Sequence, residues 1–176
     1  MHPDARVVYV DNDPLVCAHA RALMVDRELV DIVEGDVRDV DGVLGHPTTR
    51  RLIDVDEPFA VLLVALLHFV SDADDPWGLV RRLYDALPQG GYLVLSHVSH
   101  EGALRRMPQV VRENEQIYEN SNASLFMRTV ADITRLFDGM PLVEPGLVFV
   151  QEWGQEAPGN LPDAIRDAWL GGVARK

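Results

Sequence analysis

The stretch RVVYVDND, Arg6 to Asp13, is a short apolar run that ends in acids and is followed by Pro14 and a helical pattern. A second apolar run, VDIVEGDVRD from Val30 to Asp39, ends in Gly-Asp. Apolar runs that alternate with helical patterns are typical of a parallel α/β sheet. Ligands bind such sheets at the carboxyl ends of the strands, where an acid can hold a ribose through its hydroxyls. The pattern therefore predicts a nucleotide-type cofactor domain, although no glycine-rich turn precedes the first acid.

The alternation of strands and helices continues along the chain. Asp13 can cap a helix that begins at Pro14 and should end near Glu28. Gly45 and Pro47 break the segment that follows the second strand into short helical pieces. The pattern then predicts a strand over 59–67 that is apolar on both faces, as in a central parallel strand. An amphipathic helix is expected over 76–87, with Leu79, Leu83 and Leu87 on one apolar stripe, and a strand over 92–98.

The last third of the chain is less regular. A polar helical region is expected over 101–118, and Thr129 with Asp132 matches a capping box for a helix that runs to Phe137 and stops at Gly139. A strand is expected over 147–153, a loop rich in Gly and Pro over 155–163, and a final strand, weakened by glycines, over 168–174.

Composition bounds the classes of protein and partner. The chain has 176 residues, enough for one domain with a real core, and a net charge of -12, which disfavours nucleic acid as a partner. The longest apolar run, Phe59 to Val70, is too short to span a bilayer, and Met1 to Asp4 does not resemble a secretory signal. The single Cys17 excludes an intramolecular disulfide. We therefore expect a cytoplasmic protein that contacts no membrane.

Six stretches, read in order, resemble the class I S-adenosylmethionine-dependent methyltransferases. More narrowly, they resemble the actinobacterial S-adenosyl methyltransferase family, formerly a domain of unknown function. The resemblance implies a Rossmann-like α/β sheet, mostly parallel with helices on both faces, formed by a single domain over 1–176. The stretches are ARVVYVDNDP (5–14), EGDVRD (34–39), ALLHFVSD (65–72), LPQGGYLVLSH (87–97), LFDGMPLVEPGLV (136–148) and WLGGVARK (169–176).

The chain departs from this family at its front. Family members resemble one another in an upstream helical segment, a first strand and a glycine-rich turn, and these are not present here. The resemblance places that first strand between the strand at Arg6 and the strand at Phe59, so these two strands lack a ladder partner. They can close up on each other, or another chain can supply the strand. The third reading, which we favour, is an N-terminally truncated fragment of a longer protein.

The resemblance implies a cofactor, S-adenosyl-L-methionine, and residues that bind it. Asp11 would accept hydrogen bonds from the ribose hydroxyls, with Asn12 lining the pocket beside it. Asp36 would accept from the adenine amino group, with the backbone of Val37 nearby. A solvated strand end explains Asp11 and Asn12 equally simply, and a turn after Gly35 explains Asp36. Since Asp13 already serves as the helix cap, we favour the functional reading for Asp11.

The end of the central strand supplies the other candidates. Ala65 and Leu66 should face the cofactor, and His68 would contact the methyl acceptor or serve as a catalytic base. A histidine at a strand end is equally often a structural residue. His97 and His100, at the same sheet edge, are weaker candidates, and the spacing of the six histidines gives no metal site. Arg128 and Tyr118 fall where the family's acceptor pocket would lie.

Three functions follow from these residues. The first is methyl transfer from S-adenosylmethionine to a small-molecule acceptor whose identity the sequence does not reveal. The second is a nicotinamide-dependent oxidoreductase of Rossmann type, which the acid at Asp11 also fits but which lacks its G-x-G-x-x-G motif. The third is a non-catalytic, degenerate methyltransferase-like fragment. An exposed central strand edge would also favour a homodimer.

Overall fold

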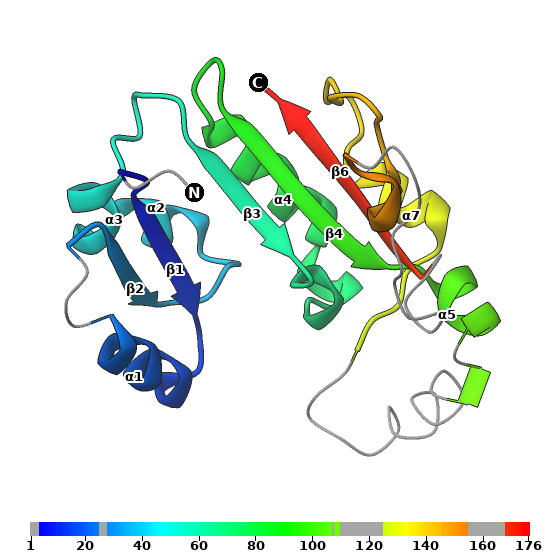
Figure 1. Cartoon of the computed structure of the whole chain (residues 1–176), viewed down its shortest axis with the longest axis horizontal. Helices are drawn as coiled ribbons and strands as arrows, with labels where there is room; N and C mark the ends of the chain where they lie inside the picture. The colour runs from blue at the N-terminus through cyan, green and yellow to red at the C-terminus, as the bar shows by residue number, and fades with distance from the viewer. Residues whose placement is uncertain (1–3, 25–27, 107, 110–124, 155–167) are drawn as a thin grey trace. The chain divides into compact units, whose positions relative to one another are not determined.

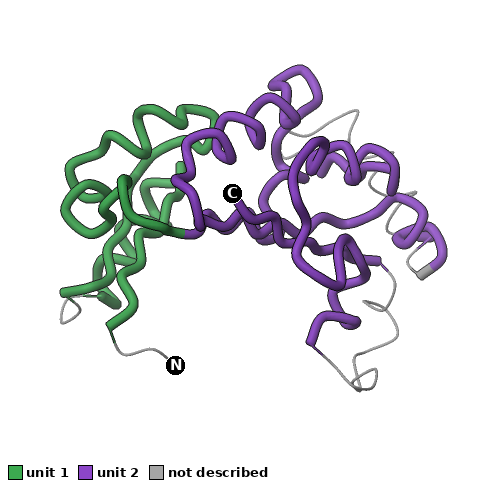
Figure 2. The backbone as a smooth tube through the Cα atoms, turned by 90° about the horizontal axis from the view of Figure 1, so that it is seen from above, with its two compact units in different colours: residues 1–59 green, residues 60–176 purple. Residues whose placement is uncertain are grey.

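The structure is a computed structural model that describes residues 4–24, 28–106, 108–109, 125–154 and 168–176. The chain forms two compact units, residues 1–59 and 60–176, which Figure 2 colours separately. Each unit has its own sheet, of two strands in the first unit and four in the second (Figure 1). Within these residues, no helix combines the length and the apolar character that a membrane span requires.

The sheet of the first unit is a pair of parallel strands. β1 (Val7–Asp11) pairs with β2 (Val30–Glu34) in a register that sets Asp11 opposite Glu34. Both strands therefore end at the same edge, and the Gly35 N–H extends the pairing by donating to the Asp11 carbonyl at 2.9 Å. The two acidic strand ends predicted from the sequence are thus brought to one edge of one sheet.

Three short helices accompany these strands. The Asp13 carboxylate caps the first helix by accepting from the Leu15 N–H at 2.8 Å, as the sequence predicts. Cys17 on this helix is fully buried, and its thiol donates to the Asp11 carbonyl. The helices are α1 (Pro14–Leu23), α2 (Val40–Gly45) and α3 (Pro47–Leu52).

The second unit is built on a four-stranded sheet in the order β3-β4-β6-β5. β3 and β4 are parallel, and β6 runs antiparallel to both of its neighbours, β4 and β5 (Figure 1). The apolar stripe predicted for the helix over 76–87 is confirmed, since Leu79, Leu83 and Leu87 are all buried. The elements are β3 (Ala60–Val64), α4 (Pro76–Ala86), β4 (Tyr92–Val98), α5 (His100–Arg106), α7 (Val130–Arg135), β5 (Val148–Phe149) and β6 (Trp169–Arg175).

The prediction for the strand over 59–67 was wrong in length and in burial. β3 is five residues long, and its Leu62 and Val64 side chains are 62% and 56% exposed. Among the described residues β3 pairs with β4 alone, so its other edge and one of its faces stay open. β1 and β3 belong to separate sheets.

Three other boundaries differ from the sequence-based expectation. α1 ends at Leu23, because the next N–H bonds to the carbonyl three residues back and closes the last turn. α7 ends at Arg135, and single hydrogen-bonded turns follow it as far as Gly139. Gly139 has a φ of +70°, which glycine adopts without a steric penalty. Of the strand expected over 147–153 only Val148–Phe149 forms, since the next three residues make a 3₁₀ turn. The expected loop 155–163 and most of the polar region 101–118 lie outside the described residues.

Candidate functional site

One group of predicted site residues lies at the carboxyl ends of β1 and β2, in the first unit. One carboxylate oxygen of Asp11 accepts from the Asp13 N–H at 2.9 Å, and no partner is recorded for the other oxygen among the described residues. Asp11 is half-buried, whereas Asn12 beside it is exposed. A carboxylate with one oxygen fixed by the backbone and the other open is a preoriented acceptor for a polyhydroxyl ligand.

Asp36 at the end of β2 is held by a neighbouring arginine. Its carboxylate accepts from the backbone N–H and from the Nε of Arg38, both at 2.9 Å, and forms an ion pair with the same guanidinium. The side-chain hydrogen bond from Arg38 is the main reason that the pKa of Asp36 is lowered. Asp36 is therefore an ionised acceptor, and Val37, half-buried, lies between the two residues.

Another group of predicted site residues lies in the second unit, at the turn that follows β3. Ala65 has a positive φ of 55°, and its N–H donates to the Ser96 hydroxyl on β4 at 3.1 Å. Leu66 follows and is half-buried, and a 3₁₀ turn, Leu67–Phe69, then places His68 in the interior at 4% exposure. Backbone strain of this kind concentrates at binding and catalytic sites, which agrees with the role expected for this turn.

The strain at Ala65 gives the first prediction. We expect Ala65→Val to lower the free energy of unfolding by roughly 1–2 kcal/mol, because a β-branched side chain tolerates a positive φ poorly. The Ala65→Gly variant should be as stable as the parent or slightly more stable, since glycine adopts this conformation without a steric penalty. Urea denaturation of the three proteins measures both effects. A valine variant as stable as the parent would show that the turn does not impose this backbone conformation.

His68 is surrounded by aromatic rings and lacks a partner for one of its nitrogens. Its ring lies edge-on to His97 at 5.7 Å and to Trp169 at 5.4 Å between centroids. The buried Nδ1 has no hydrogen-bond partner among the described residues. Burial, aided by the positive charge of Arg128, lowers the pKa of His68 to about 4. His68 is therefore neutral at physiological pH, and its buried Nδ1 is available for a hydrogen bond.

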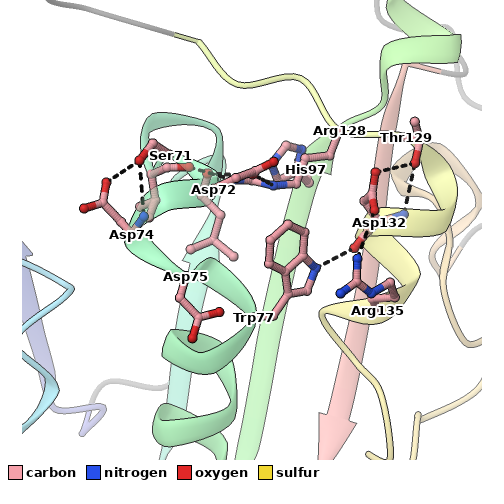
Figure 3. Close-up of polar contacts among 12 residues, drawn as sticks. Ser71, Asp72, Asp74, Asp75, Trp77, His97, Arg128, Thr129, Asp132 and Arg135 are labelled. Atoms are coloured by element: carbon pink, nitrogen blue, oxygen red, sulfur yellow. Dashed lines mark hydrogen bonds and ion pairs between the residues drawn. The ribbon is translucent and has the colours of Figure 1, made fainter.

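Arg128 binds the turn that carries His68, and Figure 3 shows its side chain beside Asp72 and His97. Its guanidinium donates to the carbonyls of Leu67 at 2.8 Å and Val70 at 2.7 Å, and to the carboxylate of Asp72 at 2.8 Å. A further hydrogen bond of 2.9 Å joins it to Nε2 of His97. Arg128 is 4% exposed, and these contacts give it a structural role that the sequence does not reveal, because most of its acceptors are backbone carbonyls. Its place at the acceptor pocket stays a prediction. Tyr118 lies outside the described residues.

The two buried histidines predict a dependence of stability on pH. Burial is the main cause that lowers the pKa of His97, like that of His68, to about 4 from an ordinary value of 6.5. The unfolded chain therefore binds more protons than the folded one between pH 6.5 and 4. The free energy of unfolding should keep the full contribution of these histidines above pH 6.5 and lose it as the pH falls toward 4. Each histidine should lower the free energy of unfolding by up to about 3 kcal/mol at pH 4, because a shift of one pKa unit corresponds to about 1.4 kcal/mol.

Urea denaturation at half-unit steps from pH 7.5 to 4.5 measures this slope. His97→Gln is the matched variant, since it removes one of the two contributions and should reduce the slope by about half. A free energy of unfolding that stays level from pH 7 to 5 in the parent would contradict the burial of neutral histidines.

The structure brings the predicted site residues together in two groups, each within one unit. Asp11, Asn12, Asp36 and Val37 share the edge of the first sheet, and Ala65, Leu66 and His68 share the turn after β3. The residues described hold no cluster of three metal-ligating side chains. A hollow of about 370 Å³ in the first unit is lined by Arg6, at the amino end of β1, so it lies at the opposite end of this strand from Asp11.

The chain is similar to several known proteins. A family model described as S-adenosyl methyltransferase matches residues 1–176. A solved structure of a candidate methyltransferase from Thermobifida fusca YX is 35% identical, with a TM-score of 0.84, over 99% of this chain and 64% of the other. A DUF574 family protein from Streptomyces avermitilis MA-4680 is 37% identical, with a TM-score of 0.83, over 99% of this chain and 66% of the other.

A curated protein also shares sequence with the chain. Carboxy-S-adenosyl-L-methionine synthase of Klebsiella pneumoniae is 28% identical over 98 residues, which are 54% of this chain and 34% of that protein. The chain thus spans about a third of this curated relative and just under two thirds of the two solved structures.

Proposed function

Because the chain belongs to the S-adenosyl methyltransferase family, we propose that it transfers the methyl group of S-adenosylmethionine to a small-molecule acceptor. The observation that carries this proposal is the pair of acids at one edge of the first sheet. Asp11 ends β1 and Asp36 lies two residues beyond the end of the parallel strand β2, and the Gly35 N–H bonds the two strand ends together. The carboxyl ends of parallel strands are where nucleotide cofactors bind in folds of this kind.

The proposed roles follow from the contacts of each residue. The open oxygen of Asp11 accepts from the ribose hydroxyls, with Asn12 beside it, while its other oxygen stays on the Asp13 N–H. Asp36, oriented by Arg38, accepts from the adenine amino group through the acceptor sites that the arginine leaves unused, and Val37 contributes its backbone. When bound, the cofactor supplies a methyl group already activated by the sulfonium. The protein then needs chiefly to align the acceptor and exclude water.

On the second unit we propose that Ala65 and Leu66 face the cofactor and that His68 contacts the methyl acceptor. The unpartnered Nδ1 of His68 is the atom available for this contact. A pKa of about 4 makes His68 a poor match for base catalysis at neutral pH, where an efficient base has a pKa near 7. We therefore assign His68 a hydrogen bond to the acceptor in its neutral form.

Equilibrium dialysis of the purified chain against S-adenosylmethionine labelled in its methyl group tests the proposal. We expect retained label that S-adenosylhomocysteine displaces and that NADH does not. Displacement by NADH alone would favour the oxidoreductase reading of Asp11. No retained label with a folded chain would refute cofactor binding by this chain and leave the non-catalytic reading.

A further inference from the structure

All the hydrogen-bonding capacity of Arg128 is used inside the protein. A guanidinium has five N–H donors and no acceptor. Nε and Nη2 donate to the carboxylate of Asp72, Nη2 also donates to the Val70 carbonyl, and Nη1 donates to the Leu67 carbonyl and to His97. These five contacts match the five donors, so Arg128 has none left for a substrate or cofactor.

The contacts of His97 fix its tautomer. Its Nδ1 lies 2.8 Å from the Val98 carbonyl, which can only accept, so Nδ1 carries the proton. Its Nε2 lies 2.9 Å from Nη1 of Arg128, which can only donate, so Nε2 presents its lone pair. A second proton on Nε2 would point at the guanidinium. His97 is therefore held neutral by one donor and one acceptor.

These two residues together restrain His68. Arg128 binds the carbonyls of Leu67 and Val70, one residue before His68 and two residues after it. The Phe126 N–H donates to the His68 carbonyl at 2.7 Å, so the same segment of chain that carries Arg128 also holds the backbone of His68. The ring of His97, fixed by Arg128, lies edge-on against the ring of His68.

We propose that Arg128 is a positioning residue that fixes His97 as the neutral Nδ1–H tautomer and holds the turn carrying His68, so that Nδ1 of His68 stays free for a ligand. The ligand role of His68 rests on the proposed function. The tautomer of His97 and the saturation of the Arg128 guanidinium are independent of the proposed function. The charges that face the two imidazoles are Arg128 itself and the carboxylate of Asp72, which is mostly exposed.

Long-range ¹H–¹⁵N correlation spectra of the histidine side chains test this proposal on the full chain. His68→Gln and His97→Gln assign the signals. At pH 7 we expect His97 to show a protonated Nδ1 and an unprotonated Nε2. Signals of the Nε2–H tautomer or of an imidazolium would overturn the proposal, whether or not the chain binds S-adenosylmethionine.

A variant separates positioning from simple packing. Arg128→Gln removes the positive charge near both imidazoles and replaces the guanidinium with a shorter amide, so the titration midpoints of His97 and His68 should rise by about one pH unit or more. Arg135→Gln is the matched control, because Arg135 also stacks on Trp77 but has a side chain that is 63% exposed. In this control the titration midpoints of His97 and His68 should stay at the parent values. Equal midpoints in Arg128→Gln and the parent would overturn the proposal. If Arg128→Gln does not fold, Arg128→Lys replaces it, with a smaller rise expected because the charge is retained.

Discussion

Replacing Arg128 by methionine is expected to lower the free energy of unfolding by about 3–5 kcal/mol. Methionine has a similar length but no donor, so the carbonyls of Leu67 and Val70 and Nε2 of His97 lose their partner in the interior. Buried acceptors without a partner keep their full desolvation cost. Since a domain is stable by only about 5–15 kcal/mol, this single change should remove a large part of the stability.

Urea denaturation of Arg128→Met beside Arg135→Met measures this effect. Arg135 lies on the exposed side of Trp77 and pairs with Asp132 at the surface, so its loss should cost less than about 1 kcal/mol. Comparable losses in the two variants would show that the buried guanidinium does not stabilise the turn after β3.

Replacing Asp11 by alanine is expected to weaken the binding of S-adenosylhomocysteine by about 100-fold or more. Two ribose hydroxyls donating to one carboxylate are worth about 1.5–3 kcal/mol each, and alanine removes both hydrogen bonds. Asp11→Asn should lie between alanine and the parent, because its amide oxygen can still accept from the Asp13 N–H while the charge is lost.

Isothermal titration calorimetry with S-adenosylhomocysteine measures these affinities. Glu34→Gln is the matched control, since Glu34 lies opposite Asp11 in the sheet register and its substitution removes the same charge from the same edge. We expect Glu34→Gln to bind within about 3-fold of the parent, because rim charges contribute little beyond steering. An Asp11→Ala variant that binds as tightly as Glu34→Gln would remove Asp11 from the cofactor site.

Local sequence patterns predicted those parts of the fold that local interactions decide. The cap at Asp13 and the capping motif at Thr129 formed as expected, because each side chain bonds to a backbone group two or three residues away. The stripe on α4 was readable because a helix repeats every 3.6 residues and buries one face. The shared edge of Asp11 and Asp36 also followed, since parallel strands that alternate with helices end on the same side.

The errors came from contacts between distant parts of the chain. Leu62 and Val64 read as buried because both faces of their strand are apolar, but burial depends on which strands pair, and β3 has one partner among the described residues. The buried role of Arg128 depends on carbonyls about sixty residues earlier in the chain, and a carbonyl leaves no mark in a sequence. His97 was a weak candidate for function, whereas the structure shows it as the acceptor for Arg128.

A ¹H–¹⁵N amide correlation experiment with stepwise addition of S-adenosylhomocysteine tests the central claim most directly. The experiment shows which backbone amides of the chain change their chemical shifts. It therefore reports both whether the ligand binds and where it binds. The account predicts saturable shifts for the amides at Asp11–Asp13 and Gly35–Arg38, where the two acidic strand ends meet. No shifts in a folded chain, or shifts confined to the hollow lined by Arg6 and Arg50, would contradict it.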